Sequence, residues 1–190
     1  MNNLYKKVGK FVVDSFHAAN RNHEIPHFKR TVFWLLKLRP RADEALKIAA
    51  ISHDIERAFR RKDMKEKRKK YPLASKKYYD PHEKRGAEII GKFLKKQGAD
   101  REMITRVKML VSEHEEGGNK DQNLLKDADN ISFFENNVSH FLPIRSGDEM
   151  AGQKVREKFD WMFGRITFDK AKKIALPMYK KAINRLESIK

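Results

Sequence analysis

Apolar residues recur at intervals of three and four along most of the chain, which is the spacing of one face of an α-helix. The clearest examples are the segment from Leu4 to about Ala19, a second from about Phe28 to Leu38, and the very apolar stretch from about Asp43 to Phe59. No segment shows the alternation of apolar and polar residues that indicates a β-strand. The pattern therefore predicts an all-α fold.

Capping and helix-breaking residues divide the rest of the chain. Ile25-Pro26 is predicted to break the chain before the second helix, and Asp80-Pro81 has the residue types of an N-cap and a first helical position. Gly98 indicates a helix end, and Asp100 the cap of the next helix. The helix that starts at Asp100 is predicted to end at Gly117-Gly118. Another begins near Asp121 and continues past Phe134, and two more span about 147–163 and 169–189. For residues 60–77, a helix extension and a loop both stay open.

Length and composition limit the classes of protein that fit. A chain of 190 residues is long enough for one hydrophobic core, so we predict a single domain over residues 1–190. No apolar run approaches the roughly 20 residues that cross a bilayer, and the N-terminal apolar run is too short for a signal peptide, so we expect a cytoplasmic protein. The chain has no cysteine, which excludes disulfides, thiolate metal sites and cysteine nucleophiles.

The formal net charge of +17 has two explanations. One is a polyanionic partner, such as a nucleic acid, a nucleotide or an anionic membrane surface. The other is a lysine-rich solvated surface, because lysines are spread along the whole chain. The densest basic run, from Arg57 to Lys77, directly follows a histidine–aspartate pair.

Histidines and aspartates lie at helix ends or within apolar helical runs, in a regular order along the chain. That order is His27, His53-Asp54, His82, His114 and Asp129. A single buried histidine beside an aspartate is most often a hydrogen-bonded core pair, so no one of these residues alone indicates a site. Helical bundles, however, build metal sites from inward-facing ligands on several helices.

The order and the flanking residues resemble the HD-domain superfamily of metal-dependent phosphohydrolases. AAISHDIER, around His53-Asp54, is similar to the central "LLHDIGK" signature of that family, with Arg57 at the lysine position. HEKRGAEII, from His82, is close to "HPEIGAEIL" of its dinuclear members, and DADNIS, around Asp129, resembles the final aspartate motif. The resemblance covers about residues 25–134 and leaves the C-terminal helices, about 147–190, unassigned.

The resemblance implies an HD-domain helical bundle with the metals between the core helices. One divalent ion would be held by the ligands His27, His53, Asp54 and Asp129. A second would be held by His82 and His114, with Asp54 bridging the two ions. Imidazole and carboxylate ligands suit Mn, Fe, Co or Ni. Ser112 to Glu115 supplies one histidine where many dinuclear phosphodiesterases have two, so cyclic-dinucleotide cleavage is not expected.

The activity implied is hydrolysis of a phosphomonoester or phosphodiester, of a nucleotide or a related phosphorylated compound, by a metal-activated water. Asp54, Arg57 and Glu56 are the candidate catalytic residues: Arg57 would contact phosphate, or alternatively form a surface ion pair with Glu56. Arg30 and Lys126 are weaker candidates for contacting phosphate. Glu56, and also Glu115 and Asp127, would orient ligands or relay protons.

Two other functions stay open at this point. A branch of the same superfamily uses this ligand set to hold two irons and activate dioxygen. Alternatively, the chain is a nucleic-acid or nucleotide-binding module with a non-catalytic metal site, in which Tyr71, Tyr78 and Tyr79 stack on bases beside the basic run. The C-terminal helices, with Trp161, Met162 and Phe163, would complete the core, cover the cleft or form a dimer face, and we favour the core.

His23-Glu24-Ile25-Pro26-His27 also matches the H-E-x-x-H pattern of zinc proteases. That pattern needs one continuous helix, and Pro26 lacks the backbone N–H that such a helix requires, so we exclude the protease. His17, His23 and His140 are given no metal role.

Overall fold

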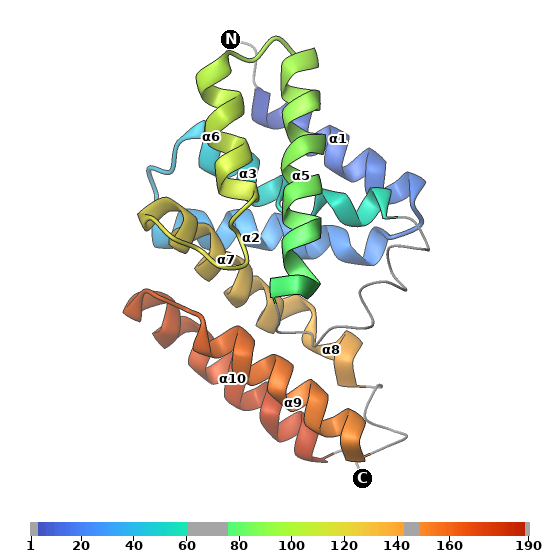
Figure 1. The fold of residues 1–190 in the computed structure, drawn as a ribbon. Coiled ribbons are helices and arrows are strands. Elements are labelled where there is room, and N and C mark those ends of the chain that lie inside the picture. The colour runs from blue at the N-terminus through green and yellow to red at the C-terminus, as the bar shows by residue number, and fades with distance from the viewer. Residues whose placement is uncertain (1–3, 61–75, 143–148, 189–190) are drawn as a thin grey trace.

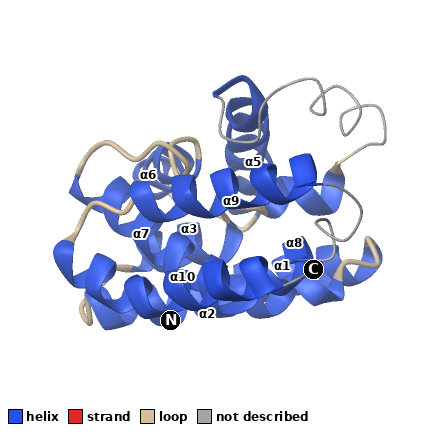
Figure 2. Cartoon of the chain, turned by 90° about the horizontal axis from the view of Figure 1, so that it is seen from below, coloured by secondary structure: helices blue, strands red, loops and turns tan. Residues whose placement is uncertain are grey.

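The computed structural model describes residues 4–60, 76–142 and 149–188, and side chains from residue 81 in the second range and from residue 152 in the third. Within these ranges the chain is helical and contains no strand (Figure 2). The predicted all-α fold is confirmed. Residues 61–75 of the basic run lie outside the described residues, as do the side chains of Tyr71, Tyr78 and Tyr79.

Figure 1 shows the described helices in their order along the chain. In chain order they are α1 (Leu4–Ala18), α2 (Ile25–Leu38), α3 (Glu44–Ser52), α5 (Lys76–Lys96), α6 (Arg101–Val111), α7 (Lys120–Asn136), α8 (Val138–Phe141), α9 (Glu149–Gly164) and α10 (Asp169–Ser188). Two short 3-10 helices, η1 (Asn22–Glu24) and η2 (Ile55–Phe59), precede α2 and follow α3.

Side-chain caps fix the starts of three helices. The carboxylate of Asp43 accepts from the N–H of Leu46 at the start of α3, and that of Asp100 accepts from Met103 at the start of α6, as predicted. Asn119 starts α7 with a capping box, a residue or two before the predicted position. Gly98 has a φ of +76°, the left-handed conformation in which a helix such as α5 commonly ends.

The positions predicted for two prolines, Pro26 before a helix and Pro81 at the first position of one, were both wrong. Helix α2 begins at Ile25, and Pro26 lies in its first turn, where a missing N–H costs no helical hydrogen bond. Helix α5 begins at Lys76, so Asp80 is not its cap and Pro81 lies inside the helix. Pro81 is only the sixth residue of α5, so the lost hydrogen bond falls near the helix start and the long remainder of α5 is unaffected.

Helices α3 and α6 end earlier than their apolar patterns predict. Helix α3 ends at Ser52, and after a turn at His53-Asp54 the chain continues as the 3-10 helix η2 instead of one helix to Phe59. Helix α6 ends at Val111, so His114 lies in the turns that follow it. Both breaks fall at predicted metal ligands.

The described helices bury two hydrophobic clusters that meet along α7. The first cluster contains residues of α1, α2, α3, α5 and α6 together with Leu125 and Ala128 of α7. The second contains Ile131 and Phe134 of α7 with residues of α8, α9 and α10. Figure 1 shows α7 crossing between the larger group of helices and the α9–α10 pair. The C-terminal helices therefore complete a core, as favoured from the sequence.

No helix within the described ranges is long and apolar enough to cross a membrane. The cytoplasmic location expected from the sequence stays a prediction.

Candidate metal centre

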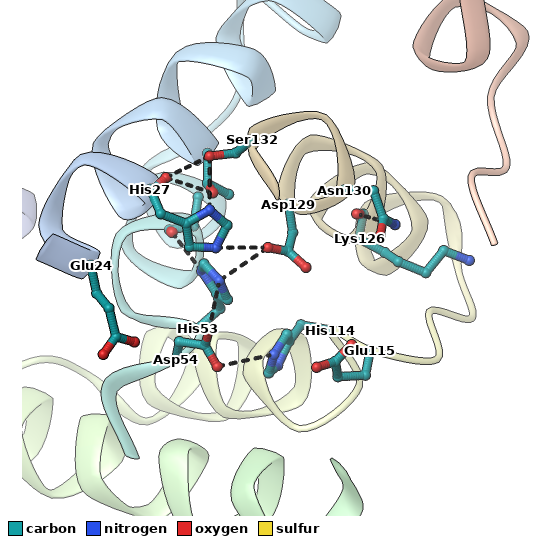
Figure 3. Close-up of polar contacts among 12 residues, drawn as sticks. Glu24, His27, His53, Asp54, His114, Glu115, Lys126, Asp129, Asn130 and Ser132 are labelled. Atoms are coloured by element: carbon teal, nitrogen blue, oxygen red, sulfur yellow. Dashed lines mark hydrogen bonds and ion pairs between the residues drawn. The ribbon is translucent and has the colours of Figure 1, made fainter. Parts of the chain in front are cut away.

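The predicted ligands, which lie far apart in sequence, converge at one place between the helices of the first cluster. His27 comes from the first turn of α2, His53 and Asp54 from the turn after α3, and Asp129 from α7 (Figure 3). The other two are His82, on α5, and His114, after α6. Each of the six residues is at most 6% exposed.

Two histidines and a carboxylate form the first half of this cluster. The Nε2 atom of His27 lies 3.0 Å from Oδ1 of Asp129, and Nε2 of His53 lies 3.3 Å from the same oxygen. The two imidazole rings are perpendicular neighbours, with centroids 5.3 Å apart. These three donor atoms all lie within 4.8 Å of one another, which is close enough for one ion to contact them all.

Asp54 lies between this half and the second half. Its Oδ2 atom is 3.6 Å from Nε2 of His53. Its Oδ1 atom is 3.5 Å from Nε2 of His82 and 3.9 Å from Nε2 of His114. The rings of His82 and His114 are neighbours, at a centroid distance of 5.3 Å. One oxygen of this carboxylate thus faces His53, and the other faces His82 and His114.

The early ends of α3 and α6 orient two of the histidines. The Nδ1 atom of His53 lies 3.0 Å from the carbonyl oxygen of Ala50, and Nδ1 of His114 lies 2.8 Å from that of Val111. Each ring folds back on a carbonyl of the last helical turn, which has no helical partner there. A carbonyl can only accept, so Nδ1 carries a proton in both rings, and Nε2 is the nitrogen left to bind a metal in the cluster.

His27 is held by a side chain of α7. Its Nδ1 atom lies 2.9 Å from Oγ of Ser132, which itself donates to the backbone oxygen of His27 at 2.8 Å. The Ser132 hydroxyl proton is used on the carbonyl, so Oγ accepts the Nδ1 proton. The Nε2 atom of His27 is then also a free donor atom for a metal.

Several buried polar atoms of this cluster lack a hydrogen-bond partner among the described residues. They are Nε2 of His53, Oδ1 of Asp54 and both ring nitrogens of His82. An unsatisfied buried polar group costs about 1–3 kcal/mol, so a folded protein rarely keeps several together without a ligand. The residues present therefore fit a bound cation, since bonds to nitrogen and oxygen would satisfy these atoms.

Electrostatics keeps the carboxylates ionised and one histidine protonated in the absence of metal. Burial raises the pKa of Asp54 and Asp129, but Arg57 beside Asp54, and His27 and His53 beside Asp129, hold both values well below the usual range. Burial lowers the pKa of His53, but Asp129 and Asp54 outweigh it and raise the pKa to about 9. A metal ion must displace that proton, so binding is coupled to proton release.

His114 has the opposite shift. Burial, and then the positive charge of His53, lower its pKa to about 4. At neutral pH its imidazole is uncharged, which is the form that binds metals.

Two further residues face the cluster. Glu115 was expected only to orient ligands or relay protons, yet its Oε1 atom lies 3.6 Å from Nε2 of His82. Arg165, which follows α9, forms an ion pair with Oε2 of Glu115 and donates to Oδ2 of Asp129 at 3.1 Å. Burial raises the pKa of Glu115, but the Arg165 charge lowers it to about 2. Sequence reasoning missed Arg165, since the resemblance ends before the C-terminal helices.

The remaining candidate catalytic residues have separate positions. The Nε atom of Arg57 lies 2.9 Å from Oδ2 of Asp54, and its Nη1 atom lies 3.3 Å from Glu24. Glu56 does not pair with Arg57; it accepts hydrogen bonds from Arg60 and Arg85 instead and does not line the cleft described below. The 3-10 turn of η2 places adjacent side chains on different sides, which explains the separation.

The weaker candidates lie outside the cluster. Arg30 forms a two-pronged ion pair with Glu135, with distances of 2.8 and 2.7 Å. The Nζ atom of Lys126 donates to Oγ1 of Thr167 and points away from the histidines (Figure 3). Asp127 accepts the N–H of Thr167 at 2.9 Å, so it orders the connection to α10. These residues tie the helices together.

The H-E-x-x-H pattern has no protease geometry. Glu24 ends η1, and Ile25 begins α2, so His23 and His27 are not on one continuous helix. The side chain of His23 is 58% exposed whereas that of His27 is 3% exposed. His17 and His140 are also exposed.

A cleft with a volume of about 150 Å³ opens beside the cluster. Its inner wall contains His27, Asp54, Glu115 and Asp129. Three other lining residues are basic, namely Arg57, Arg60 and Lys158. The rest are uncharged: Phe133, Phe141, Met162 and Asn137. Lys158 and Met162 come from α9, so the C-terminal helices form part of the cleft as well as a core. Burial lowers the pKa of Lys158 to about 8.

Comparison with known proteins gives the family. The profile of the family described as "Domain of unknown function (DUF4202)" matches residues 13–182. The chain belongs to this family. The matched segment includes all the residues of the cluster and the helices α9 and most of α10, so the family spans both hydrophobic clusters. The comparisons with curated proteins and with solved structures found no match.

Proposed function

We propose that this protein is a metal-dependent phosphohydrolase with two divalent ions in the buried cluster. His27, His53 and Asp129 would hold the first ion, and His82 and His114 the second, with Asp54 contributing one oxygen to each. The observation that carries the proposal is the convergence of these residues with unpartnered nitrogen and oxygen atoms directed at one another. The resemblance of the motifs to HD-domain phosphohydrolases supports the same assignment.

Ions in such a site supply Lewis acidity and lower the pKa of water toward neutrality. The donor set of imidazoles and carboxylates favours Mn, Fe, Co or Ni.

The residues of the cleft would bind and orient a phosphate ester. Arg57, Arg60 and Lys158 place positive charge around the opening, which favours a phosphate over a neutral substrate. Arg57 also holds Asp54 through its Nε atom, so it would fix that carboxylate while contacting phosphate oxygens. Phe133, Phe141 and Met162 provide an apolar wall that would exclude water and contact the rest of the substrate.

The dimensions of the cleft favour a small substrate. A volume of about 150 Å³ suits a single phosphate and the atoms next to it, so the remainder of a larger substrate would lie outside the cleft. We therefore propose a phosphomonoester of a nucleotide or of a related metabolite, in preference to a long nucleic acid.

The test begins with metal content. The purified chain and its His53→Ala and His82→Ala variants would be loaded with Mn²⁺ or Fe²⁺ and analysed for metal per chain. We expect close to two ions in the wild-type chain and fewer in both variants. Loaded protein would then be assayed for phosphate release from p-nitrophenyl phosphate and from nucleoside monophosphates and triphosphates.

Each alternative has its own result in this experiment. A chain that takes up no metal refutes the proposal. Iron binding with oxygen-dependent loss of a substrate, and no phosphate release, would replace it by an oxygenase. RNA or DNA binding that weakens steeply with salt and is unaffected by chelators would replace it by a binding module.

A further inference from the structure

A carboxylate that the predicted ligand set does not contain faces the second half of the cluster. Glu115 directly follows His114, and its Oε1 atom lies 3.6 Å from Nε2 of His82. Donor atoms of His82, His114 and Glu115 all lie within 4.8 Å of one another. Metal–ligand bonds in proteins are about 2 Å long, so donors at such separations can contact one ion.

The two oxygens of Glu115 have different neighbours. Oε2 is paired with Arg165, a side chain that is only 9% exposed, so the carboxylate is fixed from the side away from the histidines. Oε1 is the oxygen that faces His82. Both ring nitrogens of His82 lack a hydrogen-bond partner among the described residues, although the residue is 1% exposed. A fixed oxygen and a buried imidazole with a free lone pair therefore point at the same space.

We infer that Glu115 is a direct ligand of the second ion, together with His82, His114 and Asp54. This inference rests on the metal centre of the proposed function. It gives the second ion two imidazoles and two carboxylates, the same donors that His27, His53, Asp129 and Asp54 provide to the first. Two equivalent donor sets favour the same kind of ion at both positions. Without Glu115, the second ion would have only the shared carboxylate of Asp54.

Arg165 acts as a positioning residue for both ions. Its Nη1 atom pairs with Glu115, and its Nη2 atom donates to Oδ2 of Asp129. One guanidinium group thus orients a carboxylate of each ion, and in both cases it occupies the oxygen other than the one that faces the histidines.

The experiment is a Mn²⁺ titration of the chelator-treated full chain. Binding is measured by calorimetry and by the electron paramagnetic resonance signal of free Mn²⁺. The variant is Glu115→Gln, and the matched control is Glu116→Gln, the same change at the exposed neighbouring residue. We expect two ions in the wild-type and control chains. Glu115→Gln should keep the first ion and bind the second about tenfold more weakly or worse, since even indirect partners of a metal affect its affinity this much.

Retention of the first ion shows that the variant is folded, because its ligands come from three separate segments of the same bundle. Should Glu115→Gln fail to fold because Arg165 has lost one of its two carboxylate partners, Glu115→Asp keeps the charge and withdraws the oxygen by one methylene. Glu115→Asp is then expected to weaken the binding of the second ion alone. Wild-type affinity for both ions in a folded Glu115 variant overturns this inference and leaves the proposed centre intact. A wild-type chain that takes up no ion overturns both.

Discussion

Replacement of Arg165 by methionine should destabilise the metal-free protein strongly. The guanidinium group contacts the backbone oxygen and carboxylate of Glu115, the amide oxygen of Asn130 and the carboxylate of Asp129, and it stacks on Trp161 at 4.2 Å. Methionine has a similar volume but none of the donors. The variant therefore keeps much of the packing and loses the charge that compensates two buried carboxylates.

The magnitude follows from burial. The side chains of Arg165, Glu115 and Asp129 are 9%, 10% and 8% exposed, so solvent screens the pairs little. Removal of one partner of a buried ion pair costs about 3–5 kcal/mol, because the remaining charge stays buried without compensation. We expect a loss in this range in the free energy of unfolding.

The assay is urea unfolding followed by far-ultraviolet circular dichroism at pH 7.5, with either chelator or Mn²⁺ present. Arg156→Met is the matched control, since Arg156 is also a C-terminal arginine with carboxylate partners, Glu187 and Asp160, but is exposed. The control should unfold close to the wild type. A change of less than about 1 kcal/mol for Arg165→Met in chelator, as for an ordinary surface substitution, would refute the reasoning.

Three further predictions concern the same site. In chelator, the stability of the wild-type protein should fall as the pH rises from 6.5 to 8. The folded-state pKa of His53 is raised to about 9, and burial raises to about 8 the pKa of Glu83, whose carboxylate accepts the N–H of Glu115, so the folded chain binds more protons in this range than the unfolded chain. Urea midpoints should show a smaller fall in His53→Gln, and a midpoint that rises with pH contradicts the assignment. Ser132→Ala should weaken binding of one Mn²⁺ ion about tenfold, because the hydrogen bond that orients His27 is lost. The control Ser112→Ala loses only a bond to the Met109 carbonyl and should bind Mn²⁺ as the wild type does. Equal effects of the two substitutions would contradict the orienting role of Ser132. Lys158→Met should raise the KM for a phosphate ester about tenfold or more and leave the metal content unchanged. Lys154 lies on the same helix but is exposed, so Lys154→Met should leave the KM unchanged. A fall in metal content in Lys158→Met would instead place Lys158 in the metal centre.

Much of the helical architecture follows from local signals in the sequence. The periodic apolar residues of α1 and α10, and the caps at Asp43 and Asp100, depend on neighbours within one or two turns, and such positions were predicted to within a few residues. The candidate ligands were found by their order and by the resemblance of the residues around them to HD-domain motifs, and the structure brings all of them together.

The helix breaks and the contribution of α9 could not be predicted in this way. Helix α3 ends at Ser52 although the apolar pattern continues through the fully buried Ile55, so packing between helices, not local propensity, decides the end. Arg165 and Lys158 reach the cluster only because the second hydrophobic cluster sets α9 against α7. No short-range pattern marks a basic residue as facing a site that lies more than 35 residues earlier in the chain.

The shared position of α7 matters for anyone who builds chimeras within this family. The helix supplies Leu125 and Ala128 to one core, Ile131 and Phe134 to the other, and Asp129 to the cluster between them. A crossover after α7 would match a foreign α9–α10 pair to an unsuited surface and would also replace Arg165. A crossover before Asn119 would instead match a foreign α7 to the helices of the first cluster, so neither boundary keeps both faces of α7 with the helices that they contact.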